Sequence, residues 1–299
     1  MYPFKLNCLV QVFQAEIQVN MKRTHLKVFK SLSRLVPALL GVLALAALLL
    51  GAPPLELAAA QNSCVVTVAA ASDLTYAMKD IAADFEKSAA CSVRVSYGSS
   101  GNFETQIENG APFDVFFSAD IEYPKKLEAQ GLATPGSTYL YGIGKLILWV
   151  RNDSKLDVSK GLDALRDPSV RKIAIANPLH APYGRAAEEA LRKAGVYDAI
   201  KDRLVLGENI SQTAEFAETG NADAGILALS LVLSPALQDK GRYFLIPENL
   251  YSPIQQGAVV IGASKNQQKA QAFLDYIKTP TEKAILERYG FVLPGQGKR

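Results

Sequence analysis

Residues 64–74 read CVVTVAAASDL, an apolar run that closes on three alanines, Ser72 and Asp73. A continuous apolar run of this length is typical of a strand that is buried on both faces of a sheet. The amphipathic stretch LTYAMKDIAADFEKSA begins at Leu74 and has the pattern of a helix. Together the two predict a strand that feeds directly into a helix, with Ser72 at the junction.

The same alternation continues along the chain. Further β-rich runs are separated by amphipathic stretches such as FETQIENG, GRAAEEALRKAG and NQQKAQAFLDYIKT. Strands that alternate with helices predict an α/β fold of parallel sheets covered by helices. The predicted strands are 65–70, 92–97, 115–118, 145–150, 173–176, 224–227 and 258–261.

Two segments predict a division into lobes. TYLYGIG, near residues 139–144, joins two of these units, and LYSPIQQG, near 250–256, precedes the last strand and two helices. If the chain crosses at both places, residues 61–142 and 254–299 form lobe I and residues 143–253 form lobe II. A ligand cleft then lies between the lobes.

The first sixty residues have the features of a leader. From Met21 the chain shows a basic start, a 15-residue apolar core at 38–52 and small residues before Gln61. A membrane-spanning helix needs roughly 20 apolar residues, so a cleaved secretory signal peptide is the better interpretation. We expect cleavage after Ala60 and a secreted protein, and we interpret residues 1–20 as an upstream extension from a mis-assigned translation start.

The charge of the chain depends on this leader. Residues 1–60 hold six of the 32 Lys and Arg and two of the 29 Asp and Glu, which leaves 26 against 27 and a formal charge of −1. A nucleic-acid partner requires a basic face, so the composition argues against one.

The mature chain retains an even pair of cysteines, Cys64 and Cys91, since Cys8 lies outside it. In an oxidising compartment such a pair is compatible with one disulfide. Cys64 opens the first predicted strand and Cys91 precedes the second, so neighbouring parallel strands would bring them together. Two buried free thiols are the alternative.

Four segments that open helices share one pattern of small and polar residues. They are 71–73 (ASD), 98–101 (GSSG), 181–184 (APYG) and 208–211 (ENIS). A helix start offers unpaired backbone N–H groups and a partial positive charge, so it binds anions without a basic side chain. In open α/β sheets these junctions gather at the carboxyl edge, where ligands bind.

Side chains at these starts can add donors. Ser72 and Ser100 supply hydroxyls, Tyr183 supplies a phenol, and Ile210 supplies only its backbone N–H. The competing interpretation is structural: Ser, Asp and Asn are common helix caps. On that interpretation Asn209 and Ser211 are caps as well, and Tyr183 packs over its loop.

Other chemistry has weak support. His180 is the only histidine after the leader, and without a Cys/His cluster or an H-E-x-x-H motif no metal site is predicted. A triad of Ser72, His180 and Asp73 can be written, but no G-x-S-x-G motif accompanies it. Asp114 and Asp120 are interpreted as caps or strand-end contacts, and Trp149 as a core residue.

Several motifs resemble one known family, the periplasmic molybdate-binding proteins of ABC importers. They are VTVAAASDL, VSYGSSGNFETQIENGAPFDVFFSAD, IANPLHAPYGRAAEEAL, GENISQTAEFAETGNADAGI and LERYGFVLP, in the family's order from about Val65 to Pro294. The resemblance implies a type II two-lobed periplasmic binding fold that closes on molybdate or tungstate and delivers it to an inner-membrane permease. It also implies a monomeric binding protein that is not an enzyme and has no cofactor or free metal ion.

The resemblance extends to single positions. Ser72 and Ser100 match the family's two hydroxyl contacts, and Ile210 matches a position whose backbone N–H binds the anion. Tyr183 stands where relatives have alanine or tyrosine, and Asp73 can contribute its backbone N–H while its carboxylate turns away. One departure is Ala228, where several relatives have tyrosine, so we expect Tyr183 to supply the phenolic donor instead.

Three other functions remain to be distinguished. A receptor for sulfate or another small tetrahedral oxyanion needs the same donors, but a rigid cage sized for molybdate leaves some donors out of reach of the smaller sulfate ion. A secreted hydrolase needs Ser72 and His180 to act together. A structural module without a ligand predicts that serine substitutions leave anion affinity unchanged.

Overall fold

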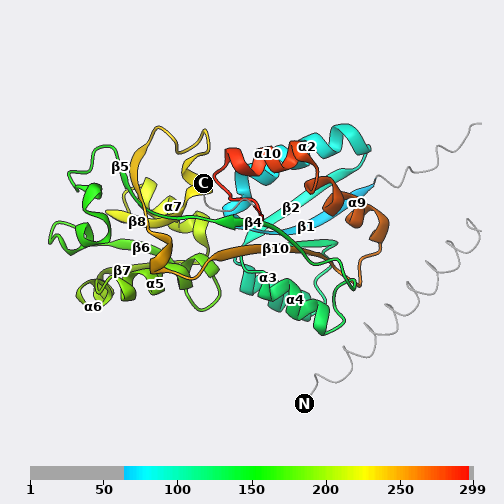
Figure 1. Ribbon diagram of the computed structural model, residues 1–299, viewed down its shortest axis with the longest axis horizontal. Coiled ribbons are helices and arrows are strands. Elements are labelled where there is room, and N and C mark those ends of the chain that lie inside the picture. The colour runs from blue at the N-terminus through cyan, green and yellow to red at the C-terminus, as the bar shows by residue number, and fades with distance from the viewer. Residues whose placement is uncertain (1–63, 296–299) are drawn as a thin grey trace, which may run out of the picture. The chain divides into compact units, whose positions relative to one another are not determined.

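The structure, a computed structural model, describes residues 64–295 (Figure 1). The predicted signal peptide, its cleavage after Ala60 and the upstream extension lie outside these residues. The described chain contains two five-stranded sheets.

The first sheet, with its helices, is called lobe I. Its strand order is β2-β1-β3-β10-β4. Helices α2, α9 and α10 lie on one side of this sheet, and α3 and α4 lie on the other (Figure 1). The strands are β1 (Val65–Ala71), β2 (Ser92–Gly98), β3 (Val115–Ser118), β4 (Tyr139–Gly144) and β10 (Ile254–Val260). The helices are the 3-10 turn η1 (Ser72–Leu74), α2 (Thr75–Ala89), α3 (Ser100–Glu108), α4 (Glu122–Ala129), α9 (Gln267–Ile277) and α10 (Pro280–Arg288).

Strand β1 is central in this sheet, as its apolar sequence predicts. It pairs in parallel with β2 on one edge and with β3 on the other. Helix α2 buries Met78, Ile81 and Phe85, and the Phe85 ring meets that of Phe273 on α9 edge-on, with centroids 5.0 Å apart. Each such buried side chain contributes about 1.5 to 3 kcal/mol, so the strand-helix unit is firmly held and the η1 turn between its parts has a fixed position.

The second sheet, with its helices, is called lobe II. Its strand order is β7-β6-β8-β5-β9. The strands are β5 (Leu146–Arg151), β6 (Ile173–Ala176), β7 (Leu204–Gly207), β8 (Ala224–Ala228) and β9 (Gly241–Leu245). The helices are η2 (Val158–Arg166), α5 (Pro182–Lys193), α6 (Tyr197–Ile200), η3 (Lys201–Arg203), α7 (Ile210–Glu218), α8 (Leu229–Val232) and η4 (Glu248–Leu250).

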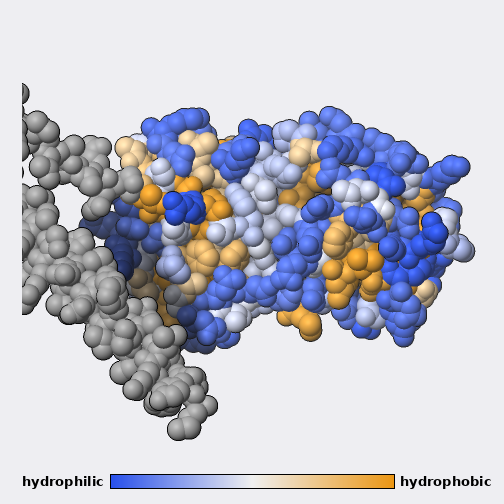
Figure 2. Space-filling view, turned by 180° about the vertical axis from the view of Figure 1, so that it is seen from behind, coloured by the Kyte–Doolittle hydropathy of each residue, from blue (hydrophilic) through white to orange (hydrophobic). Residues whose placement is uncertain are grey.

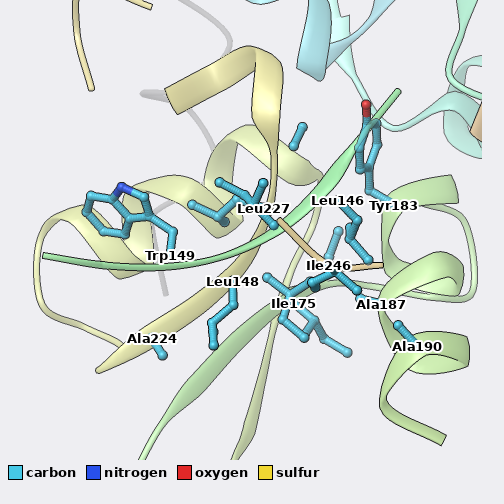
Figure 3. Close-up of a cluster of buried hydrophobic side chains, with 14 of the residues drawn as sticks. Leu146, Leu148, Trp149, Ile175, Tyr183, Ala187, Ala190, Ala224, Leu227 and Ile246 are labelled. Carbon is cyan, nitrogen blue, oxygen red and sulfur yellow. The ribbon is translucent and has the colours of Figure 1, made fainter. Parts of the chain in front are cut away.

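The lobe II core brings side chains of α5 against the sheet. Trp149 is 1% exposed, as predicted for a core residue, and it lies in one buried cluster with Leu146, Ile175 and Ala187 (Figure 3). Tyr183 lies at the edge of this cluster, and its hydroxyl points away from Ala187 (Figure 3). The core therefore fixes the start of α5 while it leaves one polar atom directed outward.

Each sheet is mixed, which corrects the prediction of parallel sheets while the two-lobed α/β class is confirmed. Strand β10 runs antiparallel to β3 and β4, and β5 runs antiparallel to β8 and β9. The chain changes sheet between β4 and β5 and again between β9 and β10. Strands that arrive from the other sheet need no helical crossover, so they are free to pair antiparallel.

Cys64 and Cys91 form a disulfide, with Cα atoms 4.6 Å apart. The register of β1 and β2 pairs Val65 with Ser92, so both cysteines stand at the same end of the parallel pair. Of the two alternatives that the sequence leaves open, the structure has the disulfide. A link over 27 residues stabilises the fold by about 3 to 4 kcal/mol in the loop-entropy model.

The face seen from behind is mainly hydrophilic, with separate apolar patches (Figure 2). Among the described residues, the exposed large hydrophobic side chains are Tyr97, Leu179, Leu206, Tyr243 and Leu245. Within residues 64–295, none of the helices has the length and apolar character needed to cross a membrane.

Candidate functional site

A small cavity lies where helix starts of the two lobes meet. Its lining includes all five residues that the sequence predicts as ligand contacts: Ser72, Asp73, Ser100, Tyr183 and Ile210. The other lining residues are Ala71, Gly98, Ser99, Ala119, Ala181, Pro182 and Asn209. Residues that are far apart in the sequence are thus brought to one place.

The cavity suits a compact ligand. Its volume is about 10 Å³. Pockets for drug-sized organic ligands occupy about 300 to 1,000 Å³. The size therefore favours an ion or a very small molecule.

Three of the four predicted helix starts have no side-chain cap. The residue before η1 is Ala71, the residue before α3 is Ser99 and the residue before α5 is Ala181, and none of them makes a side-chain capping bond. Only α7 is capped, because Asn209 accepts hydrogen bonds from the amides of Ser211 and Gln212. The capping interpretation holds for Asn209 and not for Ser72 or Ser100.

Ser100 is arranged to donate. Its hydroxyl oxygen accepts a hydrogen bond from the amide of Ala119 at 2.9 Å, and the residue is 1% exposed. A hydroxyl whose oxygen already accepts in this way keeps its hydrogen available for an acceptor. The amide at the end of β3 thus orients the Ser100 hydroxyl at the cavity.

Ser72 connects the two lobes. Its hydroxyl donates to Asn209 Oδ1 at 3.1 Å and accepts from the Ser211 amide at 3.2 Å. The Ser211 hydroxyl donates in turn to the Ser72 carbonyl at 2.9 Å. The start of α7 is thereby held against η1, which makes this a closed arrangement of the lobes.

Ile210 is the first residue of α7. An amide at this position has no carbonyl acceptor within its own helix. The Ile210 side chain is buried in the lobe II core, which holds the backbone at the cavity wall.

Tyr183 and Asp73 belong to one buried polar network. The Gln256 side-chain amide donates to Asp73 Oδ2 at 2.6 Å and to the Tyr183 hydroxyl at 3.0 Å. The Tyr141 hydroxyl donates to Gln256 Oε1 at 2.7 Å. The hydroxyl of Ser230 donates to the Asp73 carbonyl at 2.8 Å, so the network joins both lobes.

Burial dominates the titration of this network. Desolvation raises the pKa of Asp73 to about 7, and hydrogen bonds from Gln256 and Tyr183 offset only part of that effect. Desolvation, with the nearby Asp73 charge, holds the pKa of Tyr141 and of Tyr183 well above the usual value for a phenol. Both phenols are therefore neutral and can donate.

The residues of the predicted triad do not bond to one another. His180 Nδ1 lies 2.9 Å from the Ser99 hydroxyl, and its Nε2 lies 3.6 Å from a Glu208 carboxylate oxygen. Ser72 and Asp73 have the partners given above. The His180 carbonyl accepts from the Gly101 amide at 2.9 Å, and a Cβ at Gly101 would stand 2.8 Å from that carbonyl oxygen. Glycine is thus required there by the contact between the lobes.

No Lys or Arg belongs to the lining. The nearby Arg185 is paired with Asp120 across the lobes at 2.5 Å, in a separate groove. Residues 64–295 contain no group of three His, Cys, Asp or Glu side chains that could hold a metal ion. The donors at the cavity are consequently amides, hydroxyls and a phenol.

Sequence reasoning missed Gln256 and Tyr141. Both lie on strands at the crossing between the sheets, and Gln256 is fully buried. The motif YSPIQQG offered one usable signal, because a glutamine in an otherwise buried strand requires polar partners. Ala228, the position that departs from the family pattern, is the last residue of β8 and is fully buried.

Comparison with known proteins agrees with this architecture. Residues 66–292 match the family described as bacterial extracellular solute-binding protein. The chain is 42% identical over 238 residues to the molybdate-binding protein ModA of Rhodobacter capsulatus, covering 80% of this chain and 91% of that protein. It is 41% identical over 237 residues to ModA of Azotobacter vinelandii, covering 79% and 93%.

A solved structure gives the same result for the fold. The Azotobacter vinelandii periplasmic molybdate-binding protein matches with a TM-score of 0.73 and 36% sequence identity, over 77% of this chain and 99% of that one. The predicted two-lobed periplasmic binding fold is confirmed by this match. The chain belongs to the family of bacterial extracellular solute-binding proteins.

Proposed function

We propose that this protein is the periplasmic receptor of an ABC importer for molybdate, and that it also accepts tungstate. The relatives named as molybdate-binding proteins, at 41 to 42% identity, support this assignment. The bound oxyanion is the transported substrate, and the partner is a permease in the inner membrane.

The observation that carries the proposal is the set of uncapped helix starts around a cavity without Lys or Arg. A dianion is costly to remove from water. Fixed amide and hydroxyl donors offset that cost through charge-assisted hydrogen bonds, and the helix ends add a favourable potential. Because no cation is needed, the cavity can match the size of the anion and not only its charge.

Each predicted contact has a proposed role. Ser100 donates its hydroxyl hydrogen to an oxyanion oxygen, and Ser72 does the same when the anion replaces Asn209 Oδ1 as the acceptor of its hydroxyl. Ile210 and Asp73 donate backbone N–H groups, which stand at the starts of α7 and η1. Tyr183 donates its phenol, in place of the tyrosine that Ala228 cannot supply.

The remaining parts of the proposal concern organisation. Lobe I comprises 61–142 and 254–299, and lobe II comprises 143–253, joined where β4 leads into β5 and β9 leads into β10. The protein acts as a monomer, without a cofactor and without catalysis. Residues 1–60 are removed in secretion, and the mature chain begins at Gln61.

Calorimetric titration of the mature protein with molybdate, tungstate and sulfate tests this function. We expect tight one-to-one binding of molybdate and tungstate. Sulfate should bind about 5- to 150-fold more weakly for each donor that it fails to reach, since an unmet buried donor costs about 1 to 3 kcal/mol. Preference for sulfate would make the protein a sulfate receptor. Absence of binding with all three anions would contradict the proposal.

A further inference from the structure

Asp73 is an unusual neighbour for an anion. The residue lines the cavity and is 1% exposed. Its Oδ2 accepts from Gln256, but its Oδ1 has no hydrogen-bond partner among the described residues. An ionised carboxylate with an unmet oxygen is costly in such a place, and a dianion next to it would add like-charge repulsion.

Among residues 64–295, no Lys or Arg side chain lines the cavity beside this carboxyl. The groups that act on it are Gln256 on β10, Tyr183 on α5 and the backbone amides of its own turn. Tyr141 on β4 is the second phenol that faces it. Helices α2, α7 and α8 and strand β2 also pack against η1, and the groups that chiefly set the pKa of Asp73 include no Lys, Arg or His. The cavity therefore lacks the counter-charge that an ionised Asp73 would need.

Tyr183 links this carboxyl to the anion. Its hydroxyl accepts from Gln256, which leaves one phenolic hydrogen to give. The Asp73 carboxylate attracts that hydrogen, and an oxyanion in the cavity would compete for it. A protonated Asp73 needs no such donor.

We infer that Asp73 is a proton-binding site coupled to anion capture: the neutral carboxyl admits the anion and frees the phenolic hydrogen of Tyr183 to bind it. This inference rests on the proposed function. The proton comes from solvent as the lobes close, and it returns to solvent when the anion is released.

The direction of the pH effect follows from linkage. In an open form the Asp73 carboxyl is hydrated, and its pKa lies near the ordinary value of about 4. In the closed form burial raises the pKa to about 7, and the charge of the anion raises it further. At a pH between the open-form and closed-form pKa values, anion binding takes up one proton. Anion affinity therefore falls by about tenfold for each unit of rising pH in this range.

Calorimetry measures this uptake directly. Molybdate is titrated into the secreted, purified protein at about pH 6, in two buffers with different ionisation enthalpies. We expect close to one proton to be taken up per anion bound. Repeating the titration up to about pH 8 should show the fall in affinity.

The variant Asp73→Asn tests whether proton uptake at residue 73 is separable from anion binding. Asparagine is neutral and isosteric, its oxygen can accept from Gln256, and its amide can donate to the Tyr183 oxygen. We expect this variant to bind molybdate with no proton uptake and with affinity that does not vary with pH. Any protonation of molybdate itself would persist in the variant.

Glu282→Gln is the matched control. Glu282 is a second fully buried carboxyl whose pKa is raised by desolvation, but it lies on α10 and does not line the cavity. This variant should keep the wild-type proton uptake. Molybdate binding by the wild type without proton uptake, or uptake that Asp73→Asn retains, would overturn the inference and leave the proposed function standing. Absence of molybdate binding would overturn both.

Discussion

The hydroxyl of Ser72 in lobe I donates to the side-chain oxygen of Asn209 in lobe II at 3.1 Å. The same Asn209 oxygen accepts the amides of Ser211 and Gln212 at the start of α7. One side chain thus caps a helix and holds the lobes together beside the cavity. Helix capping and the contact between the lobes therefore depend on the same atom.

Substitution of Asn209 separates these roles. Asn209→Ala should lower the free energy of unfolding by about 1 kcal/mol, because the cap is lost, and should weaken molybdate binding because closure is less favourable. Asn209→Asp keeps an acceptor at a helix start, where negative charge is favourable, so stability should be retained. Its charge beside the anion should still reduce affinity. Chemical denaturation and calorimetry of both variants provide the check, and equal affinity of Asn209→Asp and wild type would contradict the account.

Ser100→Ala should weaken molybdate binding by about 1.5 to 3 kcal/mol, because a charge-assisted hydrogen bond is lost in a buried cavity. Calorimetry at constant pH measures the change. Ser118→Ala is the control, since Ser118 is also a buried serine at the end of β3, but its hydroxyl bonds to the backbone of Asp120 and does not line the cavity. If Ser100→Ala binds like Ser118→Ala, Ser100 is not a ligand contact.

Tyr183→Phe should also weaken binding, by removal of the phenolic donor. The ring remains in the lobe II core, so the fold should be preserved, although Gln256 loses one acceptor. We expect a reduced affinity with proton uptake intact, because the Asp73 carboxyl still has to be neutral. Unchanged affinity would assign Tyr183 to packing alone.

Asp73 predicts a pH dependence of stability for the closed protein, which saturating molybdate maintains. Burial raises its folded-state pKa to about 7 from 3.8, so its stabilising contribution is complete below the unfolded pKa and is lost as the pH rises through the folded pKa. The free energy of unfolding of Asp73→Asn, relative to that of wild type, should therefore rise by about 1.4 kcal/mol per pH unit between about pH 4 and about pH 7. Above that range the difference should level off. Denaturant unfolding across this range measures the gain.

Asp114 provides the contrast in that experiment. Although burial opposes it, hydrogen bonds from Ser264 and Thr67 lower the pKa of the Asp114 carboxyl. The stability that ionised Asp114 contributes is lost as the pH falls. The free energy of unfolding of Asp114→Asn should therefore lie below that of wild type at neutral pH, and the difference should shrink toward acidic pH. If the free energies of unfolding of the two variants, relative to wild type, change with pH in the same way, the environment assigned to Asp73 is wrong.

Local sequence pattern was sufficient for much of this architecture. The run before Ser72 predicted β1, and the four helix starts predicted the cavity lining, because backbone donors at such junctions follow from chain direction alone. The pattern missed β4, β7 and β9. Strand β4 contains two glycines and reads as a linker, whereas β7 and β9 are short strands at the sheet edges, where the hydrophobic signal is weakest.

Long-range contacts had no local signal. Asp73 and Gln256 are 183 residues apart in the chain, and Ser72 and Asn209 are 137 residues apart. The prediction that the sheets are parallel was wrong for a related reason. Strand β10 pairs antiparallel because the chain returns to lobe I from lobe II. Only the folded arrangement shows that the buried carboxyl of Asp73 faces two phenols, in a cavity whose described lining contains no Lys or Arg.

A crystal structure of the molybdate complex would locate the anion without ambiguity, because molybdenum gives an anomalous signal. We expect the anion in the cavity, with its oxygens within hydrogen-bonding distance of the Ser72 and Ser100 hydroxyls and the Ile210 amide. An anion held elsewhere by lysine or arginine side chains, for example by Arg185 in the neighbouring groove, would contradict this expectation.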